Sequence, residues 1–134
     1  MPHPYRPRPS ALFGSIHRPL LDVEIRSEIS GEWTIVEDVL ADTGADASLL
    51  PLGLGKLIVR NVVSGKRHMV SGVVPGAGQA VYFHRLEFRI GRRTFAAPTL
   101  IADSDDCPAI LGRAGALDRW TATFSRGRSL RIRK

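Results

Sequence analysis

Apolar and polar residues alternate along several short stretches of this chain, and that alternation predicts β-strands. Leu21, Val23 and Ile25 fall on one face of the first stretch, and the two carboxylates between them fall on the other, as in a strand with one buried face. A turn at residues 30–32 follows, and the apolar run 33–40 predicts a second strand. We expect these two strands to pair as a hairpin.

The same reasoning applies to the rest of the chain. Further strands are expected at 57–63, 82–90, 94–102, 109–111, 121–124 and 129–132. The glycine-containing stretch 52–56 lacks the spacing of a phosphate-binding loop and predicts a loop or a short irregular helix. Only 114–120 favours a regular helix, which Gly115 weakens. The sum, about eight or nine strands with one short helix near the C-terminus, predicts an all-β, closed, barrel-like fold.

Length and composition favour one domain. The chain has 134 residues, 43% of them hydrophobic, which is enough for one modest core. Residues 1–12 are rich in Pro and Arg and predict a flexible tail, which leaves 13–134 as the domain. The single cysteine, Cys107, allows no internal disulfide. Without a signal-peptide pattern or a run of roughly 18 apolar residues, we expect a cytoplasmic protein with no membrane partner.

The charge balance raises the question of an acidic partner. Lys and Arg number 19 against 13 Asp and Glu, a formal charge of +6, and such an excess is compatible with nucleic-acid binding. The excess is strongest at Arg126, Arg128, Arg131, Arg133 and Lys134. No aromatic residues are interleaved with these arginines to stack on bases. A solvated edge strand kept soluble by charge is the favoured interpretation, and nucleic acid is disfavoured as a partner.

One carboxylate stands out because it ends an apolar run. Asp42 follows Val39-Leu40-Ala41 and precedes Thr43 and Gly44. A carboxylate at the end of a buried strand is costly unless a partner satisfies it, which indicates a functional role. Gly44 permits a close approach of backbone or ligand. Asp46 adds a second carboxylate four residues after the first.

Two other stretches are informative. Residues 68–82 read as two β-prone arms around a tip of glycine and small apolar residues, either an ordinary hairpin or one that closes over a ligand. Residues 110–113 read as an apolar strand, a glycine for close packing and an arginine. By contrast, the carboxylates of 103–106 have no neighbouring ligand set and predict a solvated loop. The four histidines show no ligand spacing either.

Three stretches in this order resemble the retropepsin-like aspartic proteases, the retroviral-type proteases and their bacterial and cellular relatives. The Asp-Thr-Gly motif lies within the extended pattern Leu40-Ala41-Asp42-Thr43-Gly44-Ala45-Asp46-Ala47-Ser48-Leu49. A flap-like hairpin follows, and then Ile110-Leu111-Gly112-Arg113 before a short helix. Arg18-Pro19-Leu20 before the first strand also resembles the start of the family domain. The resemblance covers about residues 16–124.

The resemblance implies an aspartic endopeptidase that acts on peptides or proteins. Asp42 would be its catalytic carboxylate, with Thr43 and Gly44 completing the motif. The family needs two such aspartates and this chain has one motif, so the resemblance implies a homodimer with a shared active site. Two close carboxylates share a proton, one activating a water and the other polarising the scissile carbonyl. No metal and no cofactor is required.

The resemblance also assigns supporting roles. Thr43 would hydrogen-bond across the interface to the opposite active-site loop. The expected substrate-binding residues are Gly44, Asp46, Ser71, Gly72, Val73 and Val74. Asp46 would pair with Arg113, and also with Arg18 of the other subunit, so both arginines would support the site. A purely stabilising ion pair of Asp46 with Arg113 remains open as an alternative.

The chain departs from the family pattern at its end. The hairpin expected within 121–134 extends past the usual terminus, and it would either reinforce the dimer or replace the interleaved sheet of the family. Two other functions stay open. One is a catalytically weak or inactive retropepsin-like domain used for binding or dimerisation, and the other is a basic β-barrel that binds nucleic acid.

Overall fold

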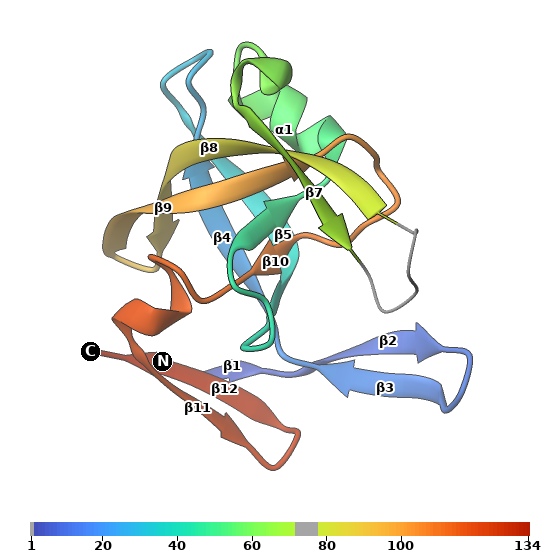
Figure 1. Cartoon of the computed structure of the whole chain (residues 1–134). Helices are drawn as coiled ribbons and strands as arrows, with labels where there is room; N and C mark the ends of the chain where they lie inside the picture. Colours follow the sequence, from blue (N-terminus) through green and yellow to red (C-terminus); the bar gives the residue numbers. More distant parts are fainter. Residues whose placement is uncertain (1, 72–77) are drawn as a thin grey trace.

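Most of the chain winds into a closed β-barrel. The computed structural model describes residues 2–71 and 78–134 (Figure 1). The barrel strands are β4 (Leu20–Arg26), β5 (Trp33–Ala41), β6 (Ser48–Leu50), β8 (Gly78–Ile90), β9 (Arg93–Ala102) and β10 (Ile110–Leu111). They pair in the order β4-β5-β10-β6-β9-β8, and β8 pairs again with β4 to close the ring. Strand β7 (Lys66–Ser71) extends from β8 outside this ring. The predicted all-β barrel is thus confirmed.

The barrel forms because its strands alternate apolar and polar residues. In β4, Leu21, Val23 and Ile25 are at most 1% exposed, and β4 pairs antiparallel with β5 as predicted. Strand β9 pairs over its whole length with β8, from Ala102 opposite Val81 to Arg93 opposite Ile90. Closure leaves the inward faces of all six strands facing one another, which removes sheet edges.

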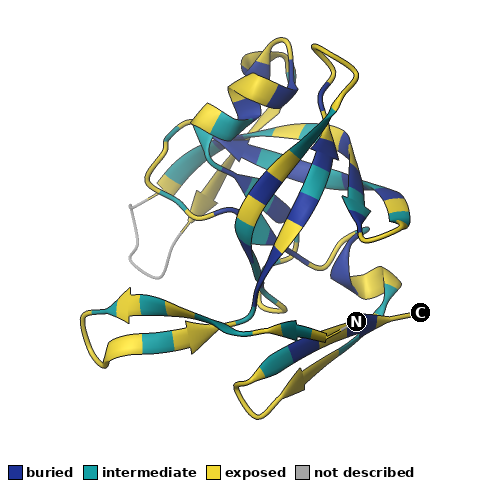
Figure 2. Ribbon diagram, turned by 180° about the vertical axis from the view of Figure 1, so that it is seen from behind, coloured by how far each residue is buried: buried dark blue, intermediate teal, exposed yellow. Residues whose placement is uncertain are grey.

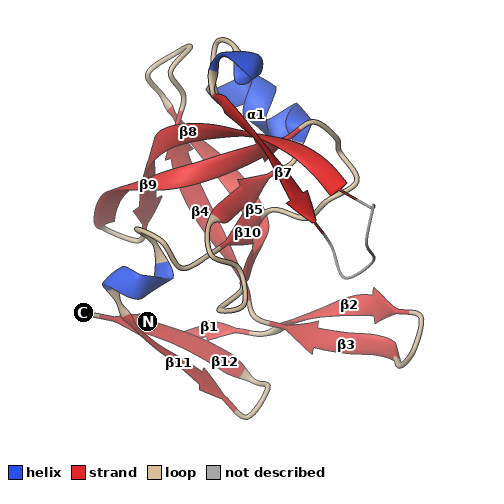
Figure 3. Ribbon diagram, viewed as in Figure 1, coloured by secondary structure: helices blue, strands red, loops and turns tan. Residues whose placement is uncertain are grey.

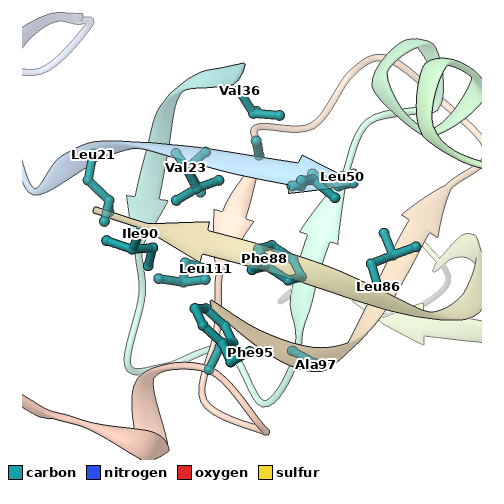
Figure 4. Close-up of a cluster of buried hydrophobic side chains, with 14 of the residues drawn as sticks. Leu21, Val23, Val36, Leu50, Leu86, Phe88, Ile90, Phe95, Ala97 and Leu111 are labelled. Carbon is teal, nitrogen blue, oxygen red and sulfur yellow. The ribbon is translucent and has the colours of Figure 1, made fainter. Parts of the chain in front are cut away.

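The core fills the barrel interior. Figure 4 shows side chains from β4, β5, β6, β8, β9 and β10 converging on one cluster. At its centre the rings of Phe88 and Phe95 stack with centroids 5.4 Å apart. Trp120 packs edge-on against Phe95 at 5.7 Å, so the segment before the last hairpin is anchored to the same core.

The helical segments differ from the sequence prediction. An α-helix, α1 (Leu52–Ile58), lies at one end of the barrel (Figure 3), and a 3-10 turn covers Val62–Ser64, where a strand at 57–63 was predicted. That prediction is wrong because the β-branched residues are buried at helical spacing rather than on alternating sides. Gly55 brings α1 against β9, since a Cβ at Gly55 would lie 2.3 Å from the Ile101 side chain.

The helix expected at 114–120 is reduced to a 3-10 turn over Leu117–Arg119. Gly115 explains the difference, because its φ of +66° is left-handed and interrupts a right-handed helix before it can start. Pro98 and Ala97 also crowd this glycine. The short turn lies between the barrel and the terminal sheet described next.

Both chain ends join one small sheet. Strands β11 (Thr121–Ser125) and β12 (Ser129–Arg133) form the predicted final hairpin, and β1 (Pro2–Pro4) pairs with β12, giving the order β1-β12-β11. Leu130 and Ile132 of β12 point into the barrel core. We call β1, β12 and β11 the terminal sheet; it lies on the side of the barrel opposite α1 (Figure 1).

The remaining strands form a separate two-stranded hairpin. Strands β2 (Arg6–Ser10) and β3 (Gly14–Arg18) pair only with each other in the described part of the chain. We call this hairpin the arm. With β1 it shows regular structure within 1–12, where the sequence predicted a flexible tail. The reason is long-range: Arg6 and Arg8 bind carboxylates on β4 and β5, and a local reading of composition cannot see such pairs.

Among the described residues, no helix is long and apolar enough to cross a membrane.

Candidate active site

Asp42 emerges where β5 leaves the barrel. Ala41 is buried and Asp42 is half-buried, so the carboxylate stands at the boundary between core and solvent. The Asp42 N–H donates to the carbonyl of Leu111 at 3.0 Å. The Asp42 carboxylate accepts the N–H of Gly44 at 2.8 Å, and the Ala45 N–H reaches the Asp42 carbonyl at 3.2 Å. This tight turn fixes the direction of the carboxylate.

The loop after Asp42 is held by the segment that follows β10. The N–H of Arg113 donates to the carbonyl of Ala45 at 2.9 Å, and the N–H of Ala114 donates to that of Asp46 at 2.8 Å. Two segments about 70 residues apart in sequence are thereby joined by backbone hydrogen bonds, which need no particular side chain.

A buried serine completes this junction. Ser48 is 1% exposed, and its hydroxyl accepts the N–H of Gly112 at 3.1 Å. A Cβ at Gly112 would lie only 2.4 Å from the carbonyl carbon and oxygen of Ala47, so the predicted close packing at this glycine is confirmed. Sequence reasoning missed Ser48. The available signal was a small polar residue inside an apolar run, a position where a buried hydroxyl needs a partner.

A groove of about 600 Å³ begins at Gly44, two residues after Asp42. The loop after β5, the paired ends of β7 and β8, and residues of β9 and β10 form its walls. Its lining comprises Gly44, Ala45, Asp46, Ala47, Leu49, Val70, Ser71, Gln79, Val81, Leu100, Asp106, Cys107 and Ile110. The lining is mostly apolar with a few polar groups, a composition typical of sites that bind ligands.

The structure brings three of the predicted substrate-binding residues to this groove, namely Gly44, Asp46 and Ser71. Ser71 is the last residue of β7, opposite Gly78 of β8. The other three, Gly72, Val73 and Val74, lie outside the described residues. Thr43 is exposed, and its expected hydrogen bond to the opposite active-site loop stays a prediction.

The two predicted supporting arginines lie differently. The Arg113 guanidinium contacts Asp118 at 3.3 and 3.4 Å, and in the described chain the expected ion pair of Arg113 with Asp46 is not formed. The two segments are linked through backbone instead, because the N–H groups of Arg113 and Ala114 donate to the carbonyls of Ala45 and Asp46. Arg18 lies at the end of β3, exposed, and its expected contact with a second subunit stays a prediction.

The one thiol of the groove is poorly suited to nucleophilic chemistry. Burial, and then the neighbouring charges of Asp105 and Asp106, raise the pKa of Cys107 above its usual value. The thiol is therefore protonated at neutral pH, whereas catalytic cysteines have depressed pKa values. Within the described ranges no three His, Cys, Asp or Glu side chains cluster as metal ligands. Asp42 lies next to the groove, since its carboxylate accepts the N–H of the lining residue Gly44.

Comparisons with known proteins find a likeness among solved structures. No family model matches the chain, and no curated protein matches it. Among solved structures, the chain is similar to the EIAV protease complexed with the inhibitor HBY-793, with a TM-score of 0.47 and 26% identity, covering 72% of this chain and 82% of that chain. We base the functional proposal on the residues of the site.

Proposed function

We propose that this chain is an aspartic endopeptidase, active as a homodimer in which two copies of Asp42 form the catalytic pair. The observation that carries the proposal is the position of Asp42. Its carboxylate follows a buried strand in a tight turn, within the motif Asp42-Thr43-Gly44, and binds the N–H of Gly44, a lining residue of a groove of about 600 Å³.

The need for a second copy follows from the chemistry. Peptide hydrolysis by carboxylates uses two groups in opposite protonation states, and the sequence holds one Asp-Thr-Gly motif. A two-fold axis beside the loop after β5 would bring two copies of Asp42 together. Two close carboxylates cannot both ionise, so the pair would share one proton and titrate as a unit.

The reaction then needs only these groups and water. The ionised carboxylate takes a proton from a water lying between the pair, and the oxygen of that water attacks the scissile carbonyl carbon. The protonated carboxylate donates to the carbonyl oxygen as negative charge develops there. Collapse of the tetrahedral intermediate breaks the C–N bond, and the leaving amine takes a proton from the pair. The mainly apolar walls of the groove would exclude bulk water from this step.

The terminal sheet suggests where the copies meet. Tyr5 donates to the Arg128 carbonyl at 2.8 Å, so the alternate positions Pro2 and Pro4 face away from β12. Proline has no N–H, and the outer edge of β1 therefore offers no donors there. The outer edge of β11 pairs with no strand in the described part of the chain. Antiparallel pairing of β11 with its copy would satisfy two-fold symmetry, so that each chain's own β12 and β1 replace an interleaved sheet.

The test is cleavage of a mixed peptide library across pH. Wild type should cleave, and Asp42→Asn should abolish cleavage while thermal unfolding and dimerisation stay unchanged. Glu37→Gln is the matched control, because Glu37 is an exposed carboxylate on the same strand β5. Retained cleavage in Asp42→Asn would refute the assignment. A wild type that dimerises but cleaves nothing would instead favour a binding or dimerisation domain.

A further inference from the structure

The arm β2–β3 is the part of the chain that its own fold uses least. Figure 2 shows it standing away from the barrel without a buried residue, and the burial pattern of both strands agrees. Its tip carries two large apolar side chains, Leu12 and Phe13, which are 81% and 67% exposed. An isolated two-stranded hairpin is at best marginally stable in water, and an exposed apolar tip indicates a binding surface.

The arm is nevertheless held in a fixed direction. The Arg6 guanidinium binds the Asp22 carboxylate at 2.8 Å and also binds Asp38, which Arg8 contacts as well. Asp38 adopts a left-handed φ of +57°, beside a register irregularity between β4 and β5, and its N–H donates to Asp22 at 3.1 Å.

The base of the arm adjoins the candidate active site. The carbonyl of Pro19, directly after β3, accepts the N–H of Ala41 at 3.0 Å, and Ala41 immediately precedes Asp42. In Figure 1 the arm projects from the side of the barrel that carries the terminal sheet, in the opposite lateral direction. The second copy needed by the Asp42 pair would occupy this side, so the arm extends into the region of the proposed interface.

Prolines make one of the two edges of the arm unsuited to strand addition. Pro7 and Pro9 share the face of Ser15 and His17, a face without carboxylate, lysine or arginine. Because prolines lack an N–H and β2 pairs with β3 through its other residues, the outer edge of β2 has no donors at these positions. The apolar tip, the proline-lined face and the outer edge of β3 remain for a partner, and the tip is the most exposed apolar part of the three.

We propose that the arm is a dimerisation arm whose apolar tip, Leu12 and Phe13, packs on the barrel of a second copy of this chain. The proposal rests on the proposed function for the location of that copy, since the Asp42 site is incomplete without it. In a two-fold dimer each copy both gives and receives an arm, so four apolar side chains leave water for each dimer formed.

The experiment compares two double variants by sedimentation velocity over a range of concentrations. Leu12→Ser/Phe13→Ser removes the tip, and Leu57→Ser/Val63→Ser removes two side chains of similar exposure, 60% and 61%, at the α1 end. We expect the tip variant to raise the dimer dissociation constant by at least about tenfold, given the burial of four side chains. The control should stay within about threefold of wild type. A smaller change in the tip variant, or an equal change in the control, overturns the proposal.

A second measurement does not depend on weakening the dimer. A photo-crosslinking residue in place of Phe13 should join two copies of the chain, and crosslinks confined to one chain would overturn the proposal. Failure of the arm and of the function are distinguishable. Cleavage that depends on Asp42, with dimerisation insensitive to the tip, refutes the arm alone. Dimerisation that depends on the tip, without any cleavage, refutes the protease proposal alone.

Discussion

Substitution of Gly112 tests how the active-site loop is held. A Cβ at this position would lie 2.4 Å from both the carbonyl carbon and oxygen of Ala47 and 2.9 Å from the backbone nitrogen of Ser48. These are backbone atoms, so a side-chain rotation cannot relieve the clash. Gly112→Ala must push the loop after β5 away from β10, and the hydrogen bond from Gly112 to the Ser48 hydroxyl, at 3.1 Å, would be lost with it.

The magnitude follows from these two effects. Overpacking of a close contact costs about 1–3 kcal/mol, and loss of one buried hydrogen bond adds about 1 kcal/mol. We therefore expect the free energy of unfolding to fall by about 2–4 kcal/mol. With an unfolding entropy of about 2.1 cal/mol/K for each of 134 residues, the midpoint Tm should drop by about 7–14 °C.

The assay is thermal and urea unfolding at one fixed protein concentration, since dimerisation makes Tm concentration-dependent. Gly78→Ala serves as control, because the nearest atom to its Cβ is the terminal methyl of Met69, at 3.1 Å. That flexible end can move, so the control should change stability by less than about 0.5 kcal/mol. A loss below about 1 kcal/mol in Gly112→Ala would refute the close-packing argument.

Three further predictions concern single side chains. Arg6 holds the pKa of Asp22 below its ordinary value, so the ionised carboxylate stabilises the fold above its unfolded pKa, and this contribution disappears as pH falls through the folded pKa. Asp22→Asn should therefore lower the free energy of unfolding at pH 7 in urea titrations, and the difference from wild type should vanish at strongly acidic pH. A difference that stays constant with pH would contradict this prediction. Arg126 has φ +52° before Gly127 at +66°, so Arg126→Asn should raise the unfolding free energy by about 0.5 kcal/mol because asparagine tolerates this conformation; a measured loss would count against the turn. The raised thiol pKa of Cys107 predicts slow alkylation by iodoacetamide at pH 7, accelerating only above the pKa of an ordinary thiol, and fast modification at pH 7 would disprove it.

The sequence predicted best where a short-range pattern decides the structure. The alternation in β4 and the long hairpin of β8 and β9 placed these strands correctly, because one face of each packs in the core. Turn residues did the same for the final hairpin at Arg126 and Gly127. Strict alternation determines which face of a strand is buried, because a shift of one residue would expose the whole apolar face.

Prediction failed where long-range contacts decide. The stretch from Ile58 to Val63 suits a strand by propensity, yet it holds the end of α1 and a 3-10 turn, and Gly55 lets α1 lie close to Ile101. Composition predicted a flexible tail over residues 1–12, where the structure has β1 and β2, and Arg6 and Arg8 contact carboxylates on distant strands. Tertiary contacts of this kind override local propensity.

The candidate site also has one feature that the sequence predicts and one that it does not. The turn at Asp42 could be anticipated from the residues around it, since a carboxylate followed by glycine at the end of an apolar run favours one local geometry. The pairing of the Arg113 guanidinium with Asp118 could not be anticipated. Its neighbour Asp118 lies five residues on, within reach as soon as the turn around Gly115 forms, and this local partner replaces Asp46.

Under the proposed function one active site needs Asp42 from two chains, and an experiment that mixes subunits tests this requirement. Wild type and Asp42→Asn are mixed in equal amounts, allowed to exchange, and assayed for peptide cleavage at constant total protein. Random pairing leaves about one quarter of the dimers with two intact aspartates, so the account predicts about one quarter of the wild-type rate. A rate of about one half, in proportion to the wild-type chains present, would place a complete site in each chain and refute a site shared by two chains.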